Sequence, residues 1–445
     1  MSARAWRPET EGGKQGMMVS GNHPRRLGSA NAFSMTMTTI EPFPNPEIPD
    51  VDDFGIMVPP WIKFPNLPFG SMGWRMGSGE YYWDQYRRWY QSQDKTSRRA
   101  ARTRYPEPEG WRGFYFGLRW MGAHPGPYRA GVVGALVGDA LGVPFEFKRP
   151  EDIPREHEID MVMPASFVKA RSAIPYGTCS DDGAQLLCLL EVLQEEEEFE
   201  PGRFSALLIK WLREGYHQSG GLVFDCGGQT ALAIKRLEEG IAPLEAGGTD
   251  KMSNGNGSLM RTLPVAIIGH LCDWSARDIV AVAQAQSRVT HGHPISQVCC
   301  ALYSLIATSL LDDPAMPVKE CYRRSFAELA EIYGKPELTE HAKALLLIDD
   351  FPKTNFRRGS GYVIDTLWTA IDCMEKSASY ASAVKAAVSY GNDTDTTACV
   401  TGGLAGIKYG DDRCLYSEGN TCIPGSWVSR LILQPESVRV IGLLS

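Results

Sequence analysis

The chain has 445 residues and a net charge of −8, and this length allows one large domain or two to three ordinary ones. The charge is unevenly divided, because residues 1–127 hold sixteen Lys and Arg against twelve Asp and Glu, whereas the remainder carries a net −12. An acidic main part lacks the clustered basic residues that phosphate binding needs, which argues against a nucleic-acid partner.

The N-terminal part divides into two segments of different composition. Residues 1–70 are rich in Gly, Pro, Ser and Asn, and the spacing of their prolines predicts a flexible or extended arm. Residues 71–127 are unusually aromatic, and residues 80–91 have the periodicity of an amphipathic helix. Two interpretations stay open for this aromatic segment: a packed accessory subdomain with Trp and Tyr as its core, or a protein-binding arm, since Trp, Tyr and Arg are typical of interface hot spots.

Residues 128–445 are predicted to form one mainly helical domain, because few runs show the alternation typical of strands. The predicted helices are 128–142, 183–195, 203–215, 228–239, 257–270, 276–288, 294–311, 318–333, 360–376, 380–390 and 394–407.

The cysteines and the apolar runs bear on the compartment. All eleven cysteines follow position 178 and none forms a Cys-x-x-Cys pair, which is typical of reduced thiols in a cytoplasmic protein. The first twenty residues hold no apolar core of a signal peptide, and no run of about eighteen apolar residues appears. We therefore expect neither export nor a membrane partner.

Two acidic turns precede apolar helical runs. Residues 391–396 place two carboxylates and two hydroxyls on a tight turn, and Ser180, Asp181 and Asp182 form a second acidic turn upstream. Either turn alone is also typical of a helix N-cap, where oxygens satisfy free backbone N–H groups. Together, the two turns offer the oxygen ligands that hard cations prefer.

Five short segments, in this order, resemble the ADP-ribosylglycohydrolase family over about residues 128–410. These segments are 134–142, 180–182, 253–261, 290–294 and 391–396. The resemblance implies an all-α orthogonal helical bundle with two divalent cations, Mg²⁺ or Mn²⁺, at its centre. The metal ligands that it implies are Ser180, Asp181, Asp182, Asp393, Asp395 and Thr396. Six oxygen ligands without Cys or His agree with Mg²⁺ or Mn²⁺ rather than zinc.

The resemblance also implies residues that contact the substrate. Glu146 would lie near the scissile bond, with Asp181 and Asp395 as further catalytic residues, although Glu146 could equally be an exposed loop carboxylate. The Gly-rich segment would let a diphosphate approach the backbone closely. The implied substrate-binding residues are Asp225, Ser253, Asn254, Gly255, Asn256, Gly257 and His291. Asp139 could instead cap or pair within the first helix.

The family activity implied is removal of ADP-ribose from a modified protein, with arginine as the expected side chain. The aromatic N-terminal extension looks like that of immunity proteins directed against ADP-ribosyltransferase toxins, which predicts toxin binding through residues 1–120. Gly183 stands where the family usually has Thr, which leaves a catalytically inactive ADP-ribose-binding protein as the alternative.

Overall fold

The computed structural model describes residues 50–111, 113–120, 126–196, 199–335, 337, 339–410 and 422–444. Within these ranges the chain forms helices, turns and three isolated β-bridges, with no β-strand. The predicted all-α class is therefore confirmed. The expectation of a flexible arm falls, up to residue 49, outside the described residues.

Residues 50–111 and 113–120 form a subdomain around buried aromatic side chains, which we call the aromatic cluster. Its helices are α1 (Pro60–Lys63), α2 (Gly77–Ser92), α3 (Lys95–Arg104) and α4 (Phe114–Trp120). In α2, Tyr82, Tyr86 and Tyr90 recur every four residues and are buried, as the helical periodicity predicts. The buried members of the cluster are Met57, Trp74, Tyr82, Tyr86, Tyr90, Ala101, Trp111, Phe114, Tyr115 and Leu118.

The aromatic cluster starts before residue 71, where the flexible arm was expected to end. Trp61 packs edge-on against Phe114, with ring centroids 5.2 Å apart. Pro60 does not disrupt this region because it occupies the first position of α1, where no N–H group is needed. Residues 50–70 therefore belong with the aromatic segment, and these contacts agree with the interpretation of a packed accessory subdomain.

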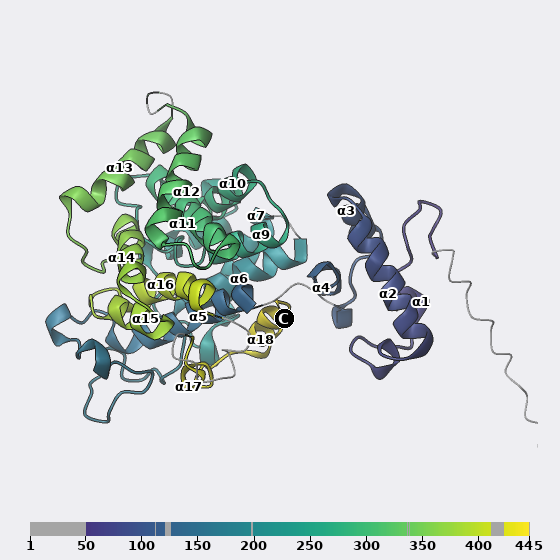
Figure 1. Ribbon diagram of the computed structural model, residues 1–445, viewed down its shortest axis with the longest axis horizontal. Coiled ribbons are helices and arrows are strands. Elements are labelled where there is room, and N and C mark those ends of the chain that lie inside the picture. Colours follow the sequence, from purple (N-terminus) through teal and green to yellow (C-terminus); the bar gives the residue numbers. More distant parts are fainter. Residues whose placement is uncertain are drawn as a thin grey trace, which may run out of the picture. The chain divides into compact units, whose positions relative to one another are not determined.

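The remaining helices form the helical domain, in which α5 and α16 lie side by side at the centre (Figure 1). Its helices are α5 (Gly126–Gly142), α6 (Asp181–Glu196), α7 (Pro201–Glu214), α8 (Gly228–Glu238), α9 (Leu263–Leu271), α10 (Ala276–Arg288), α11 (Pro294–Asp312), α12 (Val318–Tyr333), α13 (Glu340–Thr354), α14 (Val363–Lys376), α15 (Tyr380–Val388), α16 (Thr394–Tyr409), α17 (Gly425–Val428) and α18 (Pro435–Gly442).

Helices α5 and α16 pack backbone against backbone because glycines recur every four residues along α5. A Cβ atom at Gly138 would lie 2.1 Å from the carbonyl oxygen of Ala398, and one at Gly142 would lie 2.4 Å from that of Thr394. Only hydrogen fits at these positions. This packing fixes the N-terminus of α16 beside the C-terminus of α5, and that junction positions the candidate site.

Helix α11 is long and apolar enough to cross a membrane by length and composition alone. However, 78% of its apolar stretch is buried within the helical domain. Helices that are apolar all round also form the cores of large soluble domains.

Among the described cysteines, the expectation of reduced thiols holds with one exception. Nine of them form no disulfide, and eight of these nine are buried. Cys422 is disulfide-bonded, so the expectation of reduced thiols is wrong for this residue.

The structure differs from the predicted helices at the start of α9 and in three helices that were not predicted. The helix predicted from residue 257 begins only at Leu263, because the preceding residues form turns in which the Asn256 N–H donates to the carbonyl oxygen of Gly361. Helices α13, α17 and α18 were not predicted. Helix α13 contains Pro352, which in a sequence is a signal against helix.

Candidate functional site

A cavity of about 580 Å³ lies at the N-termini of α6 and α16, and this size is typical of small-molecule sites. Around it gather seven carboxylates from separate parts of the chain: Asp139, Glu146, Asp181, Asp182, Asp225, Asp393 and Asp395. Among the described residues, Arg171 is the one cation that forms an ion pair with any of them. The two acidic turns therefore belong to one site.

Asp139, near the end of α5, caps the N-terminus of α6. Its carboxylate accepts hydrogen bonds from the backbone N–H groups of Ser180 at 3.0 Å and Gly183 at 2.9 Å. Burial raises the pKa of Asp139 to about 7. Asp139 therefore caps another helix, not the first helix as the alternative interpretation had it, and it orients the acidic turn that contains Asp181 and Asp182.

Gly183 is needed for this cap. A Cβ atom at position 183 would lie 2.8 Å from Cδ2 of Leu136 and 2.9 Å from Oδ2 of Asp139. Gly183 does not line the cavity. A threonine hydroxyl at position 183 would therefore lie in the packed junction between α5 and α6, beside the Asp139 carboxylate, and not in the cavity.

The turn before α16 is tied to the other walls of the cavity. The Asn256 side-chain amide donates to Oδ2 of Asp393 at 2.8 Å, and the Thr396 hydroxyl donates to Oδ1 of Asp182 at 3.3 Å. Two buried oxygens, Oδ2 of Asp182 and Oδ2 of Asp395, have no hydrogen-bond partner among the described residues. Buried polar atoms usually have such partners, so these two oxygens are free to bind a ligand.

Burial and mutual repulsion raise the pKa values of the acidic groups. For Asp181, Asp182 and Asp395, desolvation is the largest cause and neighbouring carboxylates add to it, so each pKa lies well above its usual range. The pKa of Glu146 rises to about 8, first through burial. These carboxyls can all ionise together only beside cations. The unpartnered oxygens and the oxygen-rich donor set fit a hard divalent cation.

The Gly-rich segment supplies another wall of the cavity. Residues 255–257 line it together with His291, and a Cβ atom at Gly257 would lie 2.9 Å from Cε1 of His291. Burial, then the nearby charge of Arg261, lowers the pKa of His291 to about 3, so its imidazole is neutral. Glycine at position 257 therefore lets His291 pack directly against the loop backbone.

Three of the predicted site residues have side chains engaged elsewhere. The Ser253 hydroxyl donates to Oδ2 of Asp250 at 2.8 Å, and Oδ1 of Asn254 accepts from the Ser296 hydroxyl at 3.3 Å. Ser180 is fully buried. None of these three lines the cavity, so their side chains shape the loop and the acidic turn.

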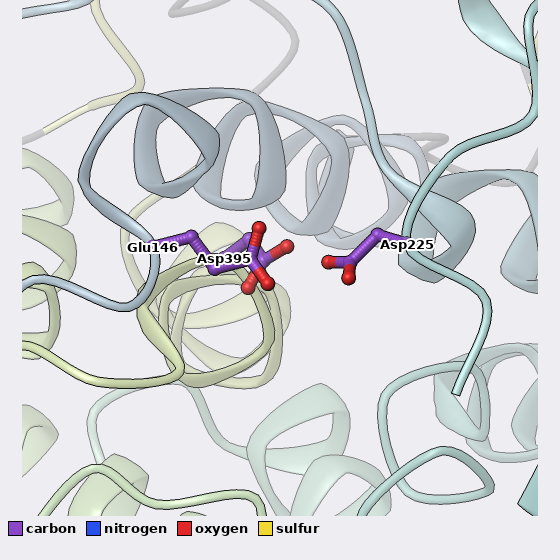
Figure 2. Close-up of side chains that lie close together, drawn as sticks. All are labelled: Glu146, Asp225 and Asp395. Carbon is purple, nitrogen blue, oxygen red and sulfur yellow. The ribbon is translucent and has the colours of Figure 1, made fainter. Parts of the chain in front are cut away.

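Glu146, Asp225 and Asp395 bring carboxylate oxygens within 4.8 Å of one another. Figure 2 shows Glu146 and Asp395 next to each other, with Asp225 pointing toward them from a separate segment. Glu146 follows α5 and is 2% exposed, so its interpretation as an exposed loop carboxylate is wrong. This group overlaps the predicted ligand set only at Asp395.

Three residues around the cavity have left-handed backbone conformations without being glycine. They are Phe147 with φ 60°, Asp225 with φ 60° and Asn392 with φ 58°, and all three line the cavity. The Phe147 N–H donates to the carbonyl oxygen of Asn392 at 2.6 Å. For phenylalanine this conformation is a marked outlier, and such outliers gather at functional sites.

The sequence analysis missed Arg171, Phe147 and the loop 359–361. Ser360 and Gly361 line the cavity, and the carbonyl oxygen of Gly359 accepts from the Asp393 N–H at 2.9 Å. The Gly-Ser-Gly composition directly before α14 is the signal that could have revealed this loop. Arg171 has no comparable signal.

Comparison with known proteins assigns the helical domain to a family. The family model for ADP-ribosylglycohydrolase matches residues 127–439. The chain belongs to the ADP-ribosylglycohydrolase family. The "ADP-ribosylarginine hydrolase Tri1" of Serratia proteamaculans is 28% identical over 313 residues, which cover 69% of this chain and 75% of that protein. The protein of the same name from Pseudomonas putida is 30% identical over 287 residues, or 63% of this chain and 70% of the relative.

A solved structure described as an "ADP-ribosylglycohydrolase-related protein complex" has the same fold. It matches with a TM-score of 0.52 at 24% identity, over 72% of this chain and 95% of that chain. The predicted family and its all-α bundle are thus confirmed. The family match begins after the aromatic cluster.

Proposed function

We propose that this glycohydrolase releases ADP-ribose from ADP-ribosylated arginine side chains and that it uses two divalent cations. The observation that carries the proposal is a cavity lined by five carboxylates, with Asp395 beside two of them and Arg171 as their one paired cation among the described residues. Both relatives described above are named ADP-ribosylarginine hydrolases, which supports arginine as the modified side chain.

The predicted ligands would hold the cations, as either Mg²⁺ or Mn²⁺. They are Asp181, Asp182, Asp393, Asp395 and Thr396, whereas Ser180, whose side chain does not line the cavity, would act indirectly by shaping the acidic turn. Bound divalent cations would neutralise the carboxylates, orient the ribose hydroxyls and supply an acidified water. The unpartnered oxygens of Asp182 and Asp395 support this assignment.

The other residues have roles in binding the substrate and moving protons. Glu146 is the candidate acid–base group, because burial raises its pKa to about 8 and a carboxyl of that pKa can hold a proton at neutral pH. Asp225 would steady the distal ribose, while residues 255–257 and His291 would bind the nucleotide. Ser253 and Asn254 would act indirectly, by holding the loop in shape.

The test is release of label from a protein ADP-ribosylated on arginine, with Mg²⁺ and with EDTA. We expect release with Mg²⁺, little with EDTA, and about a hundredfold loss or more in Asp393→Ala and Asp395→Ala, given the size of metal-based catalysis. The matched control is Asp350→Ala, which removes an exposed carboxylate on α13. Complete retention of label with Mg²⁺ rejects the proposal, and retention together with tight ADP-ribose binding indicates the inactive alternative.

We further propose that the aromatic subdomain binds an ADP-ribosyltransferase toxin, so that the chain acts as a cytoplasmic immunity protein. Helix α3 carries four arginines, at positions 98, 99, 102 and 104. A groove of about 960 Å³ is lined by Trp89, Phe54, Arg99 and Arg104. Arginines beside aromatic rings are typical of interface hot spots, and their charge favours an acidic partner surface.

A pull-down with a cognate toxin tests this second proposal. We expect capture by the full chain and loss of capture in a chain that lacks residues 1–120. The point variant Arg99→Glu/Arg104→Glu should also weaken capture, whereas Arg88→Glu, an exposed position on α2 outside the groove, should not. Equal capture by all of these proteins would exclude the aromatic subdomain as the docking site.

A further inference from the structure

Arg171 is held at the cavity by two pairs of residues, each formed by an acidic residue and a neighbouring phenylalanine. Its Nε donates to Oε2 of Glu146 at 2.7 Å, and its Nη2 lies 2.5 Å from Oδ1 of Asp225. The guanidinium carbon lies 5.4 Å from the ring centre of Phe147 and 5.3 Å from that of Phe224. Two carboxylates and two aromatic rings thus contact one guanidinium group.

This arrangement suits a guanidinium better than other cations. A planar guanidinium can donate to separate carboxylates while it stacks on aromatic rings, whereas an ammonium is a compact point charge. The contacts of the four surrounding residues are made with the guanidinium head of Arg171. A guanidinium brought by another arginine side chain could make the same contacts.

Two of the four residues, Phe147 and Asp225, have unusual backbone conformations. Phe147 and Asp225 adopt left-handed conformations, and the Phe147 N–H is bound to the carbonyl oxygen of Asn392. The side chain of Glu146 is nearly fully buried, whereas that of Arg171 is 25% exposed. Glu146 is therefore more enclosed than the arginine that it binds, and the partly exposed guanidinium of Arg171 can be exchanged for another.

We propose that Glu146, Phe147, Phe224 and Asp225 form a guanidinium subsite that Arg171 fills when no substrate is bound. During turnover, the arginine side chain from which ADP-ribose is removed takes the place of Arg171. The part of this inference that concerns turnover rests on the proposed function, while the subsite itself rests on the contacts of Arg171. Arg171 is thus an internal competitor of the substrate arginine.

Competition from within the same chain sets the expected size of the effect. A tethered group competes at an effective concentration in the millimolar range, so an external guanidinium should bind wild-type protein only weakly. Removal of Arg171 should tighten binding of methylguanidinium by about tenfold or more. Removal of Phe224 as well should cancel much of that gain, because one of the two stacking rings is lost.

The experiment is calorimetric titration of the full chain, in Mg²⁺, with methylguanidinium and separately with methylammonium. The proteins are wild type, Arg171→Ala, Arg171→Ala/Phe224→Ala and the control Arg155→Ala, which removes an exposed arginine of the preceding segment. We expect the tenfold gain for methylguanidinium in Arg171→Ala alone and a smaller gain for methylammonium. If Arg171→Ala does not fold, Arg171→Lys serves instead, because it keeps the charge and removes the planar donor group.

The outcomes separate this inference from the proposed function. Unchanged methylguanidinium affinity after loss of Arg171, or equal gains for both probes, overturns the subsite. Neither titration involves ADP-ribose. A protein that shows the expected gain but releases no ADP-ribose from modified arginine would retain the subsite and lose the proposed function, and active hydrolysis without the gain would do the reverse.

Discussion

Replacing Gly138 with alanine should separate α5 from α16 and disturb the site at their junction. The new Cβ atom would lie 2.1 Å from the carbonyl oxygen of Ala398, whereas ordinary contact begins near 3.4 Å. The two backbones must therefore move apart by roughly 1 Å, and overpacking of this kind costs about 1–3 kcal/mol. Because α16 moves as a unit, Asp395 shifts relative to Glu146, and a misplacement of about 1 Å can lower turnover a hundredfold.

Urea denaturation and the ADP-ribose release assay measure the two effects of Gly138→Ala separately. The matched control is Gly117→Ala in α4, where a Cβ atom meets nothing within 4 Å. This control should leave release unchanged and stabilise α4 by up to about 1 kcal/mol, because alanine has the higher helix propensity. Wild-type stability and wild-type release in Gly138→Ala would refute the argument that glycine packing positions the site.

Three further outcomes are expected. In EDTA, the free energy of unfolding should fall as pH rises from about 4.5 to about 8, because burial raises the folded-state pKa of Glu146 to about 8. Thermal melts over this pH range should show the fall, and Mg²⁺ should make it smaller. Glu191→Gln should lower the urea-measured free energy of unfolding by about 3 kcal/mol, since Glu191 is buried 2.8 Å from Nε2 of His217, and an unchanged value would contradict this. Gly183→Thr should lower the thermal midpoint without raising ADP-ribose release, because position 183 is already in close contact with Leu136 and Asp139. Faster release by this variant would show that the threonine hydroxyl is needed for activity.

The parts of the site that depend on residues close together in the sequence could be predicted. Asp181 and Asp393 each stand next to the start of an apolar helix, so composition and position together indicate a functional turn. The helices of the domain could also be predicted, because apolar periodicity can be recognised within a single stretch of the sequence. These features depend on neighbours along the chain, which a sequence displays directly.

The parts of the site and fold that depend on contacts between distant segments could not be predicted from the sequence. Arg171 lies in an irregular segment whose position depends on packing, including a hydrogen bond from the Ala170 N–H to the carbonyl oxygen of Pro144 at 2.9 Å. Gly183 looked like a lost ligand because the sequence does not show that Asp139, on another helix, packs against it. The aromatic cluster likewise begins earlier than its composition suggests, because Trp61 packs against rings far along the chain.

Asn256 joins two functions that the chain keeps on separate segments. Its backbone belongs to the loop expected to meet the nucleotide, and its side chain holds Asp393. Under the proposed function, a nucleotide that displaced this loop would also alter the surroundings of Asp393, so occupancy of one half of the cavity would change affinity in the other. Thermodynamic linkage makes this influence reciprocal: cations must then tighten or weaken nucleotide binding by the same factor as nucleotide changes theirs.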